Sequence, residues 1–420
     1  MSSQDEVILH KQVAIAALMT FGFISLLGDI IYEGSRGAIS AYLQLLMTPA
    51  LIVGLAIGLG EFLGYALRLF SGYFSDVTRA YWGFVITGYT LLISIPLLAF
   101  FTDWKIVILL VIIERVAKAI RTPARDTLLS VTTKGIGRGK AFGLHELLDQ
   151  VGAVVGPLIV AIAIWYKLQQ GATEIAQLQF AFVVLIIPYI LLLTVLFTGY
   201  IKLKQHTKKA LMGVGVPTKS DALSGVFYAY SFAVMLNAAG LFQVALILYI
   251  AAEMFTEILW IVPLLYLLIQ GVDAIAAPIA GIAYDKRGRS ILIAPFMLSI
   301  LPTVFITLMY VQMGIQISPS LLILLAAIFY GIVLGMQESV YRAAVADLTG
   351  ISKRGLGYGI FSTLYGLGFM ISGAVFGYII DLSKLNPLNI IYALVYTMIV
   401  EITATILLIK SLRMKSPKSE

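Results

Sequence analysis

Long apolar stretches separated by short polar breaks run along the whole chain. A membrane-spanning helix needs about 20 mostly apolar residues, and clusters of charge, glycine and proline mark the breaks between stretches of at least that length. The first and seventh stretches are long for one span, which predicts tilt or an extension beyond the bilayer. We predict twelve spanning helices, near residues 13–45, 50–74, 82–101, 106–130, 141–165, 177–201, 222–251, 257–284, 291–312, 320–347, 356–380 and 388–410.

Composition supports a membrane protein. Of the 420 residues, 60% are hydrophobic and 12% are charged, whereas a globular domain is about 45–50% apolar and about 25% charged. One core cannot hold this excess, so the pattern predicts an all-α integral membrane protein in contact with the lipid bilayer. The absence of cysteine from the sequence excludes disulfides and thiolate metal sites. The first residues do not have the pattern of a cleaved signal peptide.

The distribution of Lys and Arg predicts the orientation. If the N-terminus is inside, the predicted outer loops hold only Lys105, Lys167 and Lys384, and the inner segments hold most of the remaining basic residues. We therefore expect a multi-pass protein of the plasma membrane with both termini in the cytoplasm. The net charge of +7 fits such basic inner loops and does not require a nucleic acid as partner.

An internal repeat divides the chain. Gly72-x-x-x-Asp76 after the second predicted helix matches Gly281-x-x-x-Asp285 after the eighth, and the segment 138–144 aligns with 354–360. Repeated halves are typical of transporters with a site between them. We predict an N-terminal six-helix bundle over 1–201, a cytoplasmic linker over 202–221, and a C-terminal six-helix bundle over 222–420 that ends in a short cytoplasmic tail.

The segment 281–290, G-I-A-Y-D-K-R-G-R-S, resembles the inner-loop signature of the major facilitator superfamily, G-x-x-x-D-[RK]-x-G-[RK]. The first-half copy, G-Y-F-S-D-V-T-R, keeps Gly72 and Asp76 and lacks the Gly-Arg pair that follows. The resemblance covers nearly the whole chain. It implies twelve transmembrane helices in two pseudo-symmetric six-helix bundles, with the first and fourth helices lining a central cavity.

Two further signatures of the superfamily match in part. In the fourth helix, Arg115 stands at the family's arginine, and Lys118 and Ala119 replace its Gln-Gly pair. In the fifth helix, the antiporter pattern G-x8-G-x3-G-P-x-x-G-G ends in Val and Ala here, and small residues there let helices approach and bend. The residues that match this pattern, and that we expect to pack helices together, are Gly143, Gly152, Gly156 and Pro157. The resemblance implies a drug/proton-antiporter-like member, of a less well characterised branch with R-T-x-x-R-D-x-L in the fourth helix.

Charged residues inside the predicted helices are candidates for function. A charge at the bilayer centre costs at least about 2.5–3.5 kcal/mol, so such residues are rare unless they are used. The candidate substrate and proton-coupling residues are Asp29, Glu33, Arg36, Glu61, Glu114, Arg115, Lys118, His145 and Asp149. The candidate gating residues are Gly72, Asp76, Arg121, Arg125, Asp126, Gly281, Asp285, Arg287, Arg289, Glu338 and Arg342.

Several of these candidates have alternative interpretations. His145 and Asp149 are one turn apart, and a histidine beside a carboxylate can relay protons or bind a divalent metal. Arg121 and Arg125 approach the predicted cytoplasmic mouth, where long side chains can reach water instead. Glu338 and Arg342 are four residues apart and predict a self-neutralising pair near the inner gate.

These observations predict a secondary active transporter that works by alternating access. We expect proton-coupled efflux of a small polar or anionic solute or drug by a monomer without cofactor or resident metal. Two alternatives are open: export of a divalent metal cation through Asp29, Glu33, His145 and Asp149, and import of a small solute by proton symport. Neither an H-E-x-x-H motif nor a G-x-x-x-x-G-K-[ST] loop occurs in the sequence, so we do not expect an enzyme or direct use of ATP.

Overall fold

The computed structural model describes residues 3–133, 138–211, 223–311, 317–349 and 354–413. All regular elements of this part of the chain are helices, as the apolar pattern predicts. Short 3₁₀ turns join several of them, and the segment Gln337–Tyr341 is a π-helix. The α-helices are α1 (Ser3–Leu45), α2 (Ala50–Thr78), α3 (Tyr81–Thr90), α4 (Ser94–Leu97), α5 (Trp104–Thr132), α6 (Arg138–Gln169), α7 (Glu174–Val184), α8 (Ile186–Leu211), α9 (Gly225–Gly240), α10 (Val244–Met254), α11 (Ile261–Arg287), α12 (Ile293–Leu298), α13 (Ile300–Val311), α14 (Pro319–Met336), α15 (Arg342–Leu348), α16 (Arg354–Leu385) and α17 (Ile391–Arg413).

Ten helical segments among the described residues are long and apolar enough to cross a membrane. One of them, Ile261–Val311, has 51 residues and contains α11, α12 and α13. Helix α5 has 29 residues and is also long enough, but it carries the charged stretch of the fourth predicted span. The all-α membrane class is confirmed, and the count of twelve spans stays a prediction.

The helices pack into two compact units. The first contains residues 1–35, 67–101 and 109–218, and the second contains residues 36–66, 102–108 and 219–420. The last part of α1, from Arg36 to Leu45, and the first part of α2 therefore pack with the C-terminal helices. The predicted linker over 202–221 begins inside α8, which continues to Leu211, and its residues 212–221 lie outside the described part of the chain.

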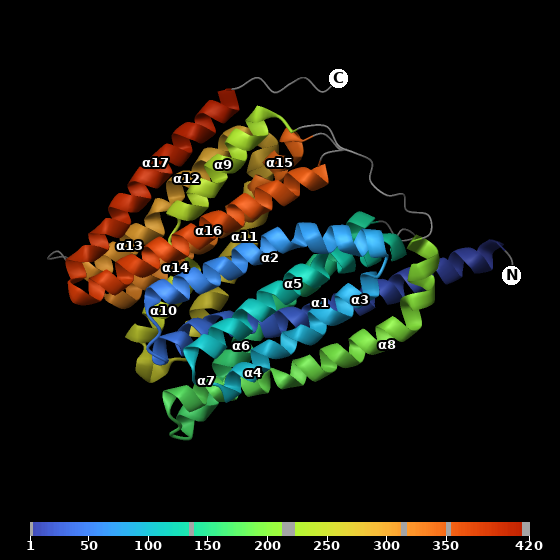
Figure 1. Cartoon of the computed structure of the whole chain (residues 1–420), viewed down its shortest axis with the longest axis horizontal. Coiled ribbons are helices and arrows are strands. Elements are labelled where there is room, and N and C mark those ends of the chain that lie inside the picture. Colours follow the sequence, from blue (N-terminus) through green and yellow to red (C-terminus); the bar gives the residue numbers. More distant parts are fainter. Residues whose placement is uncertain (1–2, 134–137, 212–222, 312–316, 350–353, 414–420) are drawn as a thin grey trace. The chain divides into compact units, whose positions relative to one another are not determined.

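Close contacts between backbones hold the helices of the first unit together. A Cβ atom added at Gly156 of α6 would lie 2.5 Å from the carbonyl oxygen of Ile30 and 2.8 Å from the nitrogen of Gly34, both in α1. One at Gly152 would lie 2.6 Å from the carbonyl oxygen of Leu26. Glycine is required at both positions because any side chain would push α6 away from α1. Figure 1 shows α1, α3, α5, α6 and α8 of this unit running side by side.

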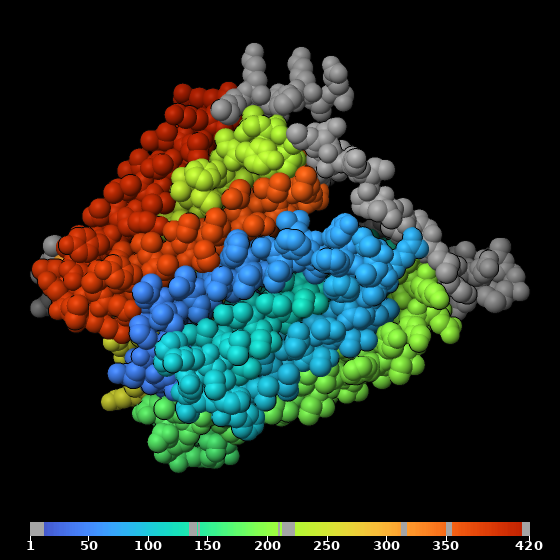
Figure 2. Space-filling model, in the orientation of Figure 1, coloured from blue at the N-terminus to red at the C-terminus, as the bar shows by residue number. Residues whose placement is uncertain are grey.

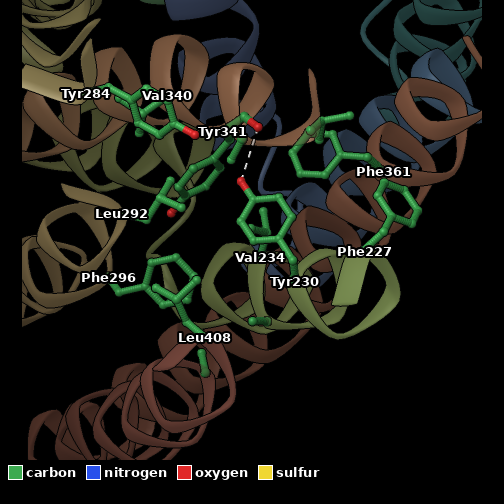
Figure 3. Packing of buried hydrophobic residues seen from close by; sticks show 14 of the residues in the cluster. Phe227, Tyr230, Val234, Tyr284, Leu292, Phe296, Val340, Tyr341, Phe361 and Leu408 are labelled. Carbon is green, nitrogen blue, oxygen red and sulfur yellow. Dashed lines mark hydrogen bonds between the residues drawn. The ribbon is translucent and has the colours of Figure 1, made fainter. Parts of the chain in front are cut away.

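A cluster of buried aromatic and aliphatic side chains forms the core of the second unit (Figure 3). The rings of Tyr230 in α9 and Phe361 in α16 are stacked, with centroids 6.1 Å apart. The hydroxyl of Tyr230 donates a hydrogen bond of 3.1 Å to the carbonyl oxygen of Tyr341 in the π-helical segment. Phe296 and Leu408 extend the cluster to α12 and α17. The core thus fixes the π-helical segment between α9, α16 and α17.

The turn between α1 and α2 is bound to the C-terminal helices of the second unit. Both carboxylate oxygens of Asp381 in α16 accept hydrogen bonds of 2.9 Å, from the backbone nitrogens of Ala50 and Leu51 at the start of α2. Tyr249 in α10 donates a hydrogen bond of 2.9 Å to the carbonyl oxygen of Thr48. These contacts satisfy backbone groups that a helix end and a turn leave without intrahelical partners.

Large apolar side chains remain exposed along the helices of both units. On α17 the exposed residues include Tyr392, Val395, Met398, Ile399, Ile402 and Ile406. Figure 2 shows α16 and α17 forming a broad outer surface of the second unit. On α6 of the first unit, Leu147, Val151, Val154, Leu158, Ile162 and Trp165 are exposed in the same way. A surface this apolar suits lipid and not water.

Candidate functional site

Tyr32 of α1 is the centre of a cation cluster in the first unit. The guanidinium of Arg115 in α5 donates a hydrogen bond to the Tyr32 hydroxyl and lies 4.7 Å from the ring centroid. The ammonium of Lys118, one turn further along α5, lies 3.6 Å from the same centroid. Two cations thus share one aromatic side chain, whose π face attracts positive charge. Arg115 and Tyr32 are buried and Lys118 is partly exposed.

Carboxylates stand beside these cations. Lys118 Nζ lies 4.0 Å from Oε1 of Glu33 in α1, and Arg115 Nε lies 3.6 Å from Oε2 of Glu114. Both separations are longer than the roughly 2.7–2.9 Å of a charge-assisted hydrogen bond. The pairs are therefore looser than a closed salt bridge, although Glu114 is only 2% exposed.

Asp29 of α1 joins this cluster to a second group of charges. Its carboxyl interacts electrostatically with Asp149 of α6, with Lys118 and Arg125 of α5, and with Glu33 one turn away. Asp29 therefore lies where α1, α5 and α6 meet, with charges of both signs around it. Helix α6 comes this close because Gly152 faces α1, and a Cβ atom there would lie 3.0 Å from the Cβ atom of Asp29.

Arg125 connects the three helices at this level. Its Nη1 donates a hydrogen bond of 2.6 Å to the hydroxyl of Ser25 in α1, and its Nε donates one of 3.0 Å to Asp126. The Nε2 atom of His145 in α6 lies 3.6 Å from Oδ2 of Asp149, which is too long for a hydrogen bond. His145 is 3% exposed and interacts electrostatically with Arg125, Asp149 and Asp126. The structure thus brings His145 and Asp149 to the Asp29 cluster.

Arg36 and Glu61, predicted for the same set, lie in the second unit and pair with each other. Nη2 of Arg36 donates a hydrogen bond of 2.6 Å to Oε1 of Glu61, and Nη1 lies 3.5 Å from the hydroxyl oxygen of Tyr266 in α11. Glu33, three residues before Arg36 in α1, approaches Lys118 of α5 in the first unit.

The first-half copy of the inner-loop signature is well defined. Asp76 accepts a hydrogen bond of 2.9 Å from the Tyr81 hydroxyl, across the turn from α2 to α3. A Cβ atom on Gly72 would meet the ring of Pro123 at 3.5 Å, an ordinary contact. Arg121 of α5 is 3% exposed and lies 4.9 Å from the centroid of the Tyr89 ring in α3. Arg121 therefore packs inside the bundle and does not reach out to solvent.

The second-half copy lies at the end of α11. Gly281 faces Ser339 of the π-helical segment, where a Cβ atom would lie 3.0 Å from the serine hydroxyl. Asp285 and Arg287 are exposed and Arg289 is partly exposed. Gly288 has φ +62, which favours glycine at this sharp turn.

Glu338 lies within the π-helical segment, and Arg342 directly follows it at the start of α15. Both are exposed.

Of the residues expected to pack the fifth predicted helix, some contact α1 or lie buried beside that contact, and one is exposed. Gly152 and Gly156 touch α1, and Pro157 is buried inside α6 next to them. Gly143 is exposed, and a Cβ atom there would meet no described atom within 4 Å. The antiporter-like pattern therefore makes a tight helix contact only at its second half.

Sequence reasoning missed several residues of the site. Tyr32, Ser25 and Tyr89 contact the three arginines and the one lysine of α5 described above. A tyrosine or serine in a spanning helix is too common to signal this role. Tyr32 and Glu33 follow Asp29 by three and four residues, and this spacing could have shown that all three lie on one face of α1. In the second unit, Asn237, Gln337 and Glu401 form a buried polar network that no motif marks.

Among the described residues, no group of three or more His, Asp or Glu side chains is arranged to hold a metal ion. Asp29, Glu33, His145 and Asp149 all belong to the first unit, where Nε2 of His145 lies 3.6 Å from Oδ2 of Asp149.

Comparisons with known proteins agree with this architecture. An uncharacterized protein of Mycobacterium tuberculosis is 32% identical over 368 residues, which cover 86% of each chain. An uncharacterized MFS-type transporter of Methanocaldococcus jannaschii is 29% identical over 382 residues, covering 87% of this chain and 88% of the relative. No family model matches the chain.

The crystal structure of the nucleoside transporter NupG is similar to this fold, with a TM-score of 0.71 over 95% of this chain and 100% of that chain. Its sequence is only 12% identical, so this likeness shows the fold alone.

Long apolar helices with a charged cluster inside one bundle define a multi-pass membrane transporter fold. With a full-length MFS-type relative and the inner-loop signature beside that fold, the chain belongs to the major facilitator superfamily of secondary transporters.

Proposed function

We propose that this protein is a proton-coupled secondary transporter that exports a small polar or anionic solute by alternating access. The observation that carries the proposal is the pair of cations on Tyr32. Arg115 and Lys118 offer two positive charges to an anionic group, and an aromatic ring holds both in place. A bulky lipophilic drug has no anionic group that could bind these two cations.

The carboxylates beside the cations support exchange. Glu33 lies 4.0 Å from the Lys118 ammonium, and a solute anion would compete with this carboxylate for the same cation. Protons enter the same competition through Asp29, whose carboxyl interacts with carboxylates and with the cations Lys118 and Arg125, so that charges of both signs act on it. A solute that neutralises Lys118 would shift this balance, which is the coupling an antiporter needs.

The direction of transport rests on α6. The contact of Gly152 and Gly156 with α1 fits the antiporter-like pattern of that helix, and we therefore favour efflux over import. We place the protein in the plasma membrane as a monomer with both termini in the cytoplasm, on the distribution of Lys and Arg.

Flux measurements on the purified protein in liposomes test this proposal. An imposed pH gradient should drive transport of anionic or polar solutes from a panel that also contains lipophilic drugs and divalent metal ions. Solute and protons should move in opposite directions. Movement in the same direction would identify a proton symporter, and transport of metal ions alone would identify a metal exporter.

Asp29→Asn is the decisive variant. It should abolish pH-driven flux and leave solute counterflow, because the amide keeps the size of the side chain and cannot release a proton. Asp103→Asn, on the exposed turn before α5, is the matched control and should transport normally. Normal flux of Asp29→Asn between about pH 5 and pH 8 would show that another group binds the coupled proton. His145 would then be the next residue to test.

A further inference from the structure

Glu401 of α17 is a carboxyl group deep in the second unit that the proposed coupling site does not use. The residue is 1% exposed. Its Oε2 accepts a hydrogen bond of 2.8 Å from Nδ2 of Asn237 in α9. Its Oε1 is buried beside Gly240 and has no hydrogen-bond partner in the structure. In the part of the chain that the structure describes, one neutral amide is therefore the only donor that reaches this carboxyl.

The orientation of Asn237 follows from its neighbour Ser299. The Ser299 hydroxyl has a single hydrogen and donates it to the carbonyl oxygen of Pro295, at 2.6 Å. Towards Asn237 it can only accept, so the amide atom that faces it at 3.0 Å is Nδ2. The same NH₂ group faces Glu401, and both of its hydrogens are used.

Every other donor of the network points away from Glu401. The Oδ1 atom of Asn237 accepts from Nε2 of Gln337 at 2.9 Å and from the hydroxyl of Tyr341 at 2.6 Å. Tyr365 in turn donates to Oε1 of Gln337 at 2.7 Å. The amide of Asn237 thus makes all four of its hydrogen bonds, and it has no further hydrogen to give to Glu401.

Among the described residues no cation is paired with this carboxyl. Helices α9, α12, α13 and α16 and the 3₁₀ turn Pro387–Ile390 pack against α17, and the ionisable groups that interact with Glu401 are the hydroxyls of Tyr341 and, on its own helix, Tyr396. Within the described residues no lysine, arginine or histidine pairs with Glu401. A carboxylate with one neutral donor and no counter-ion is far more costly to bury than the carboxylic acid.

We propose that Glu401 is a proton-binding site and that it is a neutral carboxylic acid in this arrangement, with the proton on Oε1. The site belongs to the second unit and is separate from the Asp29 cluster of the first. Binding is the simple reaction of the carboxylate with one proton from water, and it needs no further reactant.

The hydrogen-bond network connects the protonation of Glu401 to the π-helical segment Gln337–Tyr341. Asn237 bonds Glu401 on one side and the π-helical segment Gln337–Tyr341 on the other, and such segments are frequent at functional sites. Loss of the proton would place a negative charge on Glu401 and strengthen its hold on the Asn237 amide. The segment that carries Glu338 is therefore linked to the protonation of Glu401 through one side chain.

Infrared spectroscopy of the liposome-embedded protein at neutral pH tests this proposal without any transport assay. The difference spectrum of wild type minus Glu401→Gln should show the C=O stretch of a protonated carboxylic acid and no carboxylate bands. Glu253→Gln, at an exposed carboxyl of α10, is the control and should lose carboxylate bands only. Carboxylate bands in the Glu401 difference would overturn the proposal.

A second measurement keeps the test independent of the variant's folding. Wild-type protein labelled with ¹³C in its glutamate carboxyls should show an acid C=O band that shifts with the label. If no acid band responds to the label, Glu401 is ionised and the proposal fails. Either result leaves the question of solute transport open, because neither measurement involves a substrate.

Discussion

Single residues of the first unit show how a charged cluster is kept inside a membrane protein. Tyr32 uses both of its properties: its hydroxyl accepts from Arg115 and its ring faces Lys118. Burial of a cation is costly unless it is paired and hydrogen-bonded. The ring and the hydroxyl reduce this cost while the side chains stay charged, and under the proposed function these cations bind the solute.

The two roles of Tyr32 can be separated by substitution. Tyr32→Phe keeps the ring but leaves a buried guanidinium hydrogen without its acceptor, at a cost of about 1–3 kcal/mol. Tyr32→Leu also removes the cation–π contacts, worth about 0.5–2 kcal/mol. We expect thermal stability and solute counterflow to fall in the order wild type, Phe, Leu. Tyr73→Leu, at an exposed tyrosine of α2, should change neither, and equal behaviour of all variants would remove Tyr32 from the site.

At the scale of elements, glycine contacts decide which helices share a site. Helix α6 reaches Asp29 because Gly152 and Gly156 let its backbone touch α1. Gly143 belongs to the same sequence pattern and makes no such contact. A small residue permits close approach of two helices only where a second helix packs against that face.

The pair Gly156 and Gly143 offers a matched test of this packing. Gly156→Leu should force α6 away from α1, with an overpacking cost of about 1–3 kcal/mol, and should lower the unfolding temperature and impair flux. Gly143→Leu adds the same side chain at an exposed position and should leave both unchanged. Thermal unfolding in detergent measures the first effect. Equal stability of the two variants would contradict the α1–α6 contact.

The hydrogen bonds from Ala50 and Leu51 at the start of α2 to Asp381 of α16 are a second contact between elements that can be tested. Asp381→Ala removes two hydrogen bonds from a carboxylate to the first backbone amides of α2, where a negative charge is favoured. Such bonds contribute about 1.5–3 kcal/mol each, so at least a tenfold faster thiol labelling of Leu51→Cys is expected. The sequence contains no cysteine, and the introduced thiol is therefore the only one labelled.

Asp103→Ala serves as the control for Asp381→Ala, since Asp103 accepts a hydrogen bond at the start of its own helix α5. It should leave the labelling rate of Leu51→Cys unchanged. If Asp381→Ala also leaves this rate unchanged, Asp381 is not what holds the start of α2.

At the scale of the whole molecule, the orientation in the membrane is a prediction from charge. Lys208 near the end of α8 and Leu385 at the end of α16 are exposed and lie at predicted inner and outer positions. Single cysteines at these positions, in intact cells, should react with a membrane-impermeant reagent only at Leu385→Cys. Reaction of Lys208→Cys from outside would reverse the predicted topology.

The sequence by itself determined the all-α membrane class and the family. These properties depend on local quantities: the length of an apolar stretch, the count of charges and the spacing of a signature such as Gly281 to Arg289. The sequence also marked the charged residues of α1 and α5, because an ionisable residue inside an apolar helix stands out against its neighbours.

Only the tertiary structure decided which of these charges meet. Arg36 pairs with Glu61 of α2, and Glu33 approaches Lys118 of α5. Gly152 packs against α1 and Gly143 does not, and Glu401 is covered by a network from three distant segments. The physical reason is that sequence spacing sets where a side chain lies along and around its own helix. Which helix it faces depends on how all the apolar surfaces pack together.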